Sequence, residues 1–211
     1  MSALDDTKSQ VQCWLEEPSA SRLEKLFNDL TDRIRIIDEA RFTEGAIHSF
    51  LETFLRLLDS GCLFSSDEPL HSCDDSPRPD LVFANGICVE LKRVRMNALE
   101  LPARVVPPTR YNKQGQLMST FVPEVQKYLC KLSNDDLLEL KIKKRFRHMY
   151  KGCETIQELV GKGQDQARKY VEEMSRLPQF EGLIHGGYVA VQVGSPFVVK
   201  ECGEKEKEKE M

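Results

Sequence analysis

The chain has 211 residues, of which 40% are hydrophobic and 30% are charged. This length and apolar content predict one globular domain with a sizeable core. The formal net charge of −4 excludes a surface that is basic all round, and so tight coating of nucleic acid without a local site. No apolar run is long enough for a membrane helix, and the first residues, MSALDDTKSQVQCW, lack the basic and apolar segments of a secretory signal.

Seven cysteines occur at wide spacings, without a CxxC pair. A structural zinc site is therefore not expected, and the thiols are expected to be reduced. We accordingly expect an intracellular protein, cytoplasmic or nuclear, with no membrane partner.

Two helices are predicted in the first part of the chain. Residues 21–37 carry apolar side chains at helical spacing, which predicts a packing helix. A second helix is expected from about Phe42 to Leu58, where Gly61 follows as a stop signal. Glu44, His48 and Glu52 lie four residues apart and share one face of that helix.

A hairpin is the central motif of the sequence. After an expected strand at 62–66 and a loop rich in Asp, Ser and Pro at 67–78, the apolar run 81–83 meets Asn85-Gly86 and then the run 87–92. Asn-Gly between two apolar runs is a strong hairpin signal. The turn brings Asp80 and Glu90 to one end of the hairpin, and Lys92 shares a face of the strand with Glu90.

Two acids and a lysine at one place suit a hard cation such as Mg²⁺ or Mn²⁺, which takes carboxylate and water ligands. Such a cation neutralises phosphate charge and activates a bound water. The alternative interpretation is that Asp80 caps a strand and that Glu90 and Lys92 form a surface ion pair.

The second half of the chain is read as an insertion at about 94–153, followed by a helix and two strands. Ser133 and Asp136 resemble a capping box before a helical segment that carries apolar residues to Ile142. The dense basic run of the chain, residues 141–151, either contacts phosphates or forms a solvated face of an amphipathic helix. Thr155 and Glu158 predict a second capping box, opening a helix to about Met174, and residues 188–193 and 197–199 are expected to be strands.

The run RPDLVFANGICVELKR resembles the core motif of the PD-(D/E)XK nuclease superfamily. Gln166 and Tyr170 match the glutamine and tyrosine that RecB-like members carry on the helix after the lysine strand. Glu44, followed four residues later by His48, is similar to the nuclease-like domain associated with AAA-ATPase-like proteins. The resemblance covers residues 40–93 and 154–200.

This resemblance implies a restriction-endonuclease-like α/β core of helix, three-strand meander, helix and strand, with an added N-terminal helix and a helical insertion. It implies metal ligation by Glu44, Asp80, Glu90 and the Leu91 carbonyl. Lys92 would be catalytic together with Asp80 and Glu90, and Gln166 and Tyr170 would hold substrate or orient the site. Glu52 is the rival of Glu44, and the alternative interpretations are a buried structural histidine at His48 and a core residue at Tyr170.

The expected organisation is an N-terminal extension at 1–39, a nuclease-like domain at 40–202 and a disordered charged tail at 203–211. The expected function is Mg²⁺-dependent hydrolysis of DNA or RNA phosphodiester bonds. The alternative is a catalytically silent domain of the same fold that binds protein or nucleic acid. Expected partners are nucleic acid and either another protein or a second copy of the chain.

Overall fold

The computed structural model describes residues 3–34, 44–63, 79–106, 122–183 and 186–203. Its centre is an open mixed sheet in the order β1-β2-β3-β4, made of Leu81–Val82, Ile87–Val94, Gly186–Val193 and Phe197–Glu201. The β1–β2 and β3–β4 pairs are antiparallel, and β2 and β3 run parallel. The mixed α/β class that the sequence predicts is therefore confirmed.

The predicted hairpin is formed by β1 and β2, with Leu81 opposite Val89. Gly86 has a φ of 78°, a left-handed conformation that glycine adopts without steric cost. Asn85 caps the turn, because its Oδ1 accepts the Ile87 N–H at 3.4 Å. The strand expected at 62–66 is represented by one bridge, Leu63 to Phe83; its remaining residues, the loop at 67–78 and the end of the charged tail at 204–211 lie outside the described residues.

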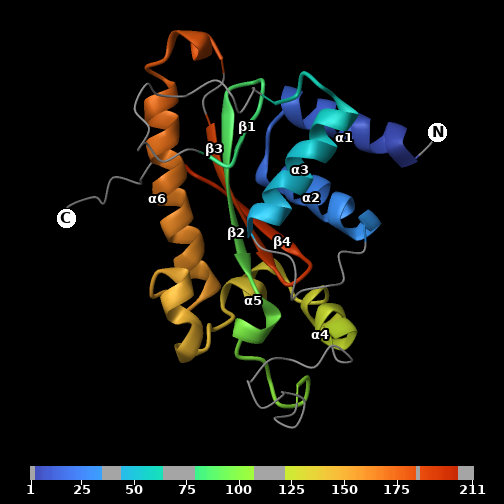
Figure 1. Ribbon diagram of the computed structural model, residues 1–211, viewed down its shortest axis with the longest axis vertical. Helices are drawn as coiled ribbons and strands as arrows, with labels where there is room; N and C mark the ends of the chain where they lie inside the picture. Colours follow the sequence, from blue (N-terminus) through green and yellow to red (C-terminus); the bar gives the residue numbers. More distant parts are fainter. Residues whose placement is uncertain (1–2, 35–43, 64–78, 107–121, 184–185, 204–211) are drawn as a thin grey trace.

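Helices cover both faces of the sheet (Figure 1). Because side chains alternate along a strand, Ile87, Val89 and Leu91 join the cluster formed with α1 (Ala3–Glu16), α2 (Ala20–Ile34) and α3 (Glu44–Leu58). Cys88 and Val94 face the other way, into the cluster formed with α6 (Ile156–Met174). The architecture is therefore three-layered, and the even-numbered positions of β2 face α6.

The N-terminal segment contains two helices, so the prediction of a single added helix is wrong. The first residues are mostly polar, but α1 has one buried face, on which Thr7, Val11 and Trp14 are fully buried. The Trp14 ring lies 4.2 Å from the Phe83 ring and 6.1 Å from the Tyr188 ring, centroid to centroid. Residues 3–34 thus contribute to the same core as the sheet.

Helix α2 also closes the outer edge of strand β4. The Asn28 Oδ1 atom accepts the Phe197 N–H at 2.8 Å, and Glu24 Oε2 accepts the Val199 N–H at 3.1 Å. Edge strands otherwise present unpaired backbone groups to other chains. Two polar side chains of α2 therefore accept backbone N–H groups of β4 that a fifth strand would otherwise bind.

Helix α6 forms as predicted and lies close to the sheet. Thr155 accepts the Glu158 N–H at 3.2 Å, but the Glu158 carboxylate accepts the Glu154 N–H, so only half of the predicted capping box is made. A Cβ atom on Gly163 would lie 2.7 Å from Val189 Cγ1. The glycine at that position therefore lets the helix lie close to the sheet.

The segment between β2 and α6 consists of short elements. They are η1 (Met96–Ala98), α4 (Val122–Leu129), α5 (Asn134–Leu138) and η4 (Lys144–Tyr150). The capping box of Ser133 and Asp136 is present. The helix predicted to reach Ile142 ends at Leu138, because Ile142 instead forms a bridge with Leu99.

The basic run forms a 3₁₀ helix, which corrects the expectation of an amphipathic α-helix there. Among the described residues, no helix has both the length and the apolar character required to cross a bilayer. The cysteines within the described ranges are free thiols, in agreement with the sequence-based expectation.

Candidate active site

The backbone pairing of β1 with β2 does not continue to Pro79. The side chain of Asp80 makes the next hydrogen bond to β2. Continuing the register of Leu81 opposite Val89 would place residue 79 opposite Leu91. Proline has no N–H to donate to the Leu91 carbonyl. The Leu91 N–H donates to Asp80 Oδ2 at 2.7 Å, so the Asp80 carboxylate is fixed at this edge of β2.

Glu90 and Lys92 lie on the face of β2 that is turned toward α6. Glu90 is only 2% exposed, and its Oε1 is ion-paired with Lys92 Nζ. The Lys92 side chain is 14% exposed. The prediction that both residues share one face is confirmed, and the surface ion pair of the alternative interpretation is wrong in one respect, because this pair is buried.

Tyr170 and Gln166 complete this side of the site from α6. Gln166 Nε2 donates to the Tyr170 hydroxyl at 2.7 Å. That hydroxyl lies close enough to Glu90 for the carboxylate to raise its pKa. Burial, followed by the charges of Glu90 and Asp80, raises the pKa of Tyr170, so the phenol stays protonated and acts as a hydrogen-bond donor. The sequence-predicted residues of β1, β2 and α6 therefore meet at one place.

Burial also raises the pKa of Asp80 above its ordinary 3.8, against the opposing effects of the Leu91 N–H, Lys92 and His48. A poorly solvated carboxylate of this kind gains from a nearby cation. Asp80, Glu90 and the Leu91 carbonyl are hard oxygen donors of the type that Mg²⁺ and Mn²⁺ take, with water in the remaining positions. The donor set present thus fits the expected metal.

Helix α3 borders the candidate site on a third side. His48 is close enough to Asp80 to lower the pKa of that carboxyl, a contact that the sequence suggested only through the shared helix face. Glu52 lies 3.8 Å from His48 Nε2 and 3.2 Å from Arg56 Nη2, so it is held along α3 by two neighbouring side chains. Glu44 is the first residue of α3, and its side chain lies outside the described part of the structure.

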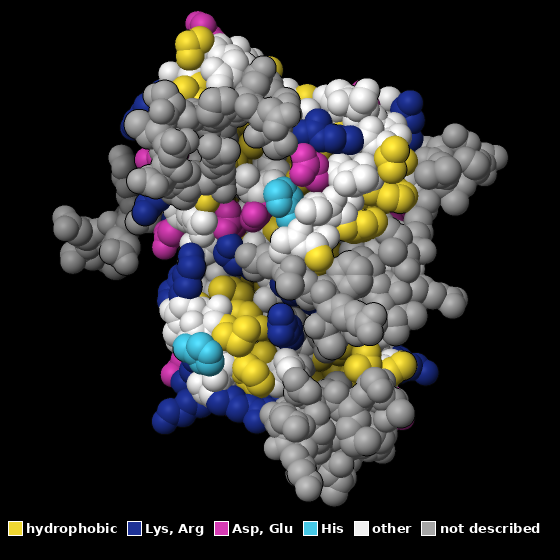
Figure 2. Space-filling view, viewed as in Figure 1, with side chains coloured by type: hydrophobic (Ala, Val, Ile, Leu, Met, Phe, Trp, Pro, Cys, Tyr) yellow, Lys and Arg dark blue, Asp and Glu magenta, His cyan; other side chains and the backbone are white. Residues whose placement is uncertain are grey.

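Within the described ranges, no three His, Cys, Asp or Glu side chains converge as a complete ligand group. The two carboxylates of Asp80 and Glu90 therefore form the described core of the candidate metal site. Figure 2 shows acidic side chains and a histidine gathered at the centre of this face, above an apolar patch framed by Lys and Arg.

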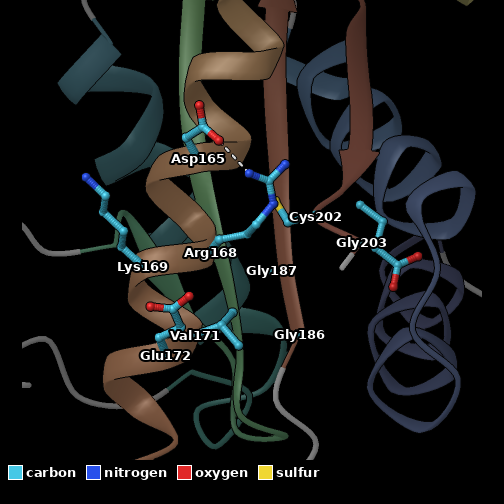
Figure 3. A pocket seen from close by; sticks show the side chains of 10 residues that line it. Asp165, Arg168, Lys169, Val171, Glu172, Gly186, Gly187, Cys202 and Gly203 are labelled. Atoms are coloured by element: carbon cyan, nitrogen blue, oxygen red, sulfur yellow. Dashed lines mark hydrogen bonds and ion pairs between the residues drawn. The ribbon is translucent and has the colours of Figure 1, made fainter. Parts of the chain in front are cut away.

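A separate open groove lies on the other flank of α6 (Figure 3). It is lined by residues of α6 and of the ends of β3 and β4, among them Arg168, Gly187 and Cys202. Arg168 is ion-paired with Asp165 at 2.5 Å, and burial raises the pKa of Cys202 to about 12. A thiol with that pKa is a poor nucleophile at neutral pH, so we place the chemistry at Asp80 and Glu90.

The chain matches no family model, no curated protein and no solved structure.

Proposed function

We propose that this chain is a metal-dependent nuclease of the PD-(D/E)XK type that hydrolyses phosphodiester bonds. The observation that carries the proposal is the meeting of Asp80, Glu90 and Lys92 with Tyr170 and Gln166 of α6. These residues come from segments about 75 positions apart. Packing alone does not explain a buried Glu90 and a half-buried Asp80 beside a lysine, because burying an acid costs free energy.

The proposed roles follow from the contacts. Asp80, Glu90 and the Leu91 carbonyl hold Mg²⁺ or Mn²⁺, with Glu44 as a further ligand. When bound, the ion neutralises phosphate charge and lowers the pKa of a coordinated water. Lys92 lies beside the Glu90 carboxylate and stabilises negative charge that develops on the phosphate. Tyr170 holds Glu90 in position by donating its hydroxyl hydrogen, and Gln166 holds Tyr170.

A second candidate is a catalytically silent domain of the same fold that binds protein or nucleic acid. It is favoured by the finding that the described residues provide two carboxylates and no complete three-residue ligand group. The two candidates differ in one measurable property, which is turnover in the presence of metal.

The deciding experiment is cleavage of end-labelled single- and double-stranded DNA and RNA with Mn²⁺, comparing wild type with Glu90→Gln. We expect wild type to cleave at least one substrate and the variant to be slower by about 100-fold or more, because a charge that acts on the transition state is lost. Glu139→Gln, an identical change at an exposed position, is the matched control and should cleave as wild type does.

Calorimetric titration with Mn²⁺ separates binding from chemistry. Lys92→Ala should bind Mn²⁺ and fail to cleave, since the lysine acts on the phosphate rather than on the ion. A wild-type protein that takes up no Mn²⁺ would rule out the nuclease and leave the silent domain. Cleavage retained by Lys92→Ala would remove that lysine from the mechanism.

A further inference from the structure

The positive charge of this acidic chain is concentrated beside the candidate site. Residues 141–151, KIKKRFRHMYK, contain six Lys or Arg and no acid, whereas the whole chain has a net charge of −4. Lys143 and Arg147 are used within the fold, because they bond the Asn97 carbonyl and the Glu154 carboxylate. Lys144, Arg145 and Lys151 are exposed.

This segment is fixed at the end of strand β2. The Lys143 N–H donates to the Ala98 carbonyl at 2.8 Å. The Arg95 N–H donates to the Tyr150 hydroxyl at 3.2 Å, and Arg95 follows directly after β2, three residues beyond Lys92. The exposed cations are therefore held beyond the strand that carries Glu90 and Lys92.

A chain of contacts leads from this segment to the acids. Lys151 Nζ lies 3.5 Å from Gln166 Oε1, Gln166 bonds Tyr170, and the Tyr170 hydroxyl lies near Glu90. Lys162 of α6 also donates to the Lys151 carbonyl, which fixes the turn at that point. Lys151, the last residue of the basic segment, thus connects that segment to the candidate active site.

The same segment exposes apolar and aromatic surface between its cations. Met149 is 50% exposed, Phe146 is half-buried, and the Arg145 guanidinium lies 4.7 Å from the centre of the Phe146 ring. Figure 2 shows hydrophobic side chains framed by Lys and Arg in the lower part of this face, where Figure 1 places the chain before α6. Bases of a single strand stack on surfaces of this kind while cations follow the phosphates; a duplex keeps its base faces covered.

We propose that residues 141–151, together with Lys162, form a binding track for a single-stranded nucleic acid and deliver its backbone to the site at Asp80 and Glu90. The proposal rests on the proposed nuclease function and names its substrate class. DNA and RNA single strands share the required chemistry, and the two are separate arms of the test.

The test is fluorescence anisotropy of 5′-labelled 20-nucleotide strands, oligo(dT) and oligo(U), in EDTA so that no cleavage occurs. Lys144→Glu/Arg145→Glu should weaken binding at least about 10-fold. It should also lower the slope of log affinity against log salt by about 1.4, since each lost phosphate contact on a single strand contributes about 0.7. Lys8→Glu/Lys25→Glu makes the same charge change at exposed positions on α1 and α2 and should bind within about 2-fold of wild type.

The stacking part is tested with Phe146→Leu, which keeps an apolar side chain in the half-buried position. Single-strand affinity should fall at least about 5-fold, with the salt slope unchanged. The track would be overturned if a duplex of equal length bound as tightly as the single strand. Equal binding by the Lys144/Arg145 variant and its control would also overturn it.

Failure of the track and failure of the nuclease give different results. Wild type that cleaves with Mn²⁺ while Lys144→Glu/Arg145→Glu cleaves and binds equally well contradicts the track alone. A Glu90→Gln protein that binds the strand as wild type does but no longer cleaves supports both. Binding through the track by a wild-type protein that never cleaves contradicts the nuclease, and with it delivery into the site.

Discussion

Asp80 lies in a partly buried position that disfavours the charged form of its carboxylate. It sits at an edge where the backbone ladder ends, and it gains a single backbone N–H from Leu91 in return for its lost water. Residues that serve a site commonly cost stability in this way. The cost follows a definite pH dependence, because burial raises the pKa of Asp80 in the folded state.

We predict that Asp80→Asn is more stable than wild type at pH 7 in EDTA and equally stable below about pH 4. A carboxyl with a raised folded-state pKa binds its proton more tightly when folded, so the free energy of unfolding falls as the pH rises from the unfolded to the folded pKa. Asparagine keeps the acceptor for Leu91 and carries no charge at any pH. Thermal unfolding of both proteins from pH 3 to pH 8 measures the difference, and parallel curves would contradict it.

On the scale of single elements, one glycine sets how closely α6 approaches the sheet. Gly163 lies against Val189, and α6 carries both Gln166 and Tyr170. The distance between the two halves of the candidate site therefore depends on a position that is not itself in the site.

Gly163→Ala should destabilise the protein by about 1–3 kcal/mol, because the new methyl group would overlap the Val189 side chain in a closely packed layer. Gly161→Ala is the matched control on the same helix: its Cβ meets nothing within 4 Å. That change should stabilise by up to about 1 kcal/mol through helix propensity alone. Urea unfolding of the two variants should thus give changes of opposite sign, and a stabilised Gly163→Ala would show that the layers can separate freely.

Local sequence signals predicted the elements whose causes are local. The Asn85-Gly86 turn and the alternation along β2 each act over a few positions, and the structure confirms both. The end of α5 was not predicted correctly, because Leu99 pairs with Ile142 from more than 40 residues away. The half-made capping box at Thr155 has a local cause, because the Glu158 carboxylate accepts the Glu154 N–H instead of the Thr155 N–H. The positions of His48 and Lys151 beside the site depend on tertiary packing. The sequence signal for His48 was the helix face that it shares with Glu44, and for Lys151 it was the composition of the basic run.

At the scale of the whole molecule, the sheet is shared by two apolar clusters, and the N-terminal helices belong to one of them. The sequence did not predict α1 because its buried residues are few and lie among polar ones. Trp14 nevertheless packs against Phe83, which directly follows β1.

Trp14→Ala should destabilise the entire domain by about 3–5 kcal/mol through the cavity that it leaves. Cys13→Ala, at an exposed neighbouring position, should change stability by no more than about 0.5 kcal/mol. Circular dichroism and Tyr170-region hydrogen exchange during urea unfolding would report on the two clusters separately. Loss of α1 alone, with the sheet and α6 intact, would show that the N-terminal helices are a detachable extension.

The two hydrogen bonds between α2 and β4 join parts of the chain that are synthesised at different times. Asn28 and Phe197 are 169 residues apart, and Glu24 and Val199 are 175 apart. At about 5–20 residues per second of synthesis, α2 leaves the ribosome roughly 10–30 seconds before the strand whose N–H groups it binds. Through that interval the Phe197 and Val199 N–H groups that these acceptors bind do not yet exist. A chain halted before β4 would lack the strand edge that α2 covers, and Glu24 would keep only its bonds from Asn134.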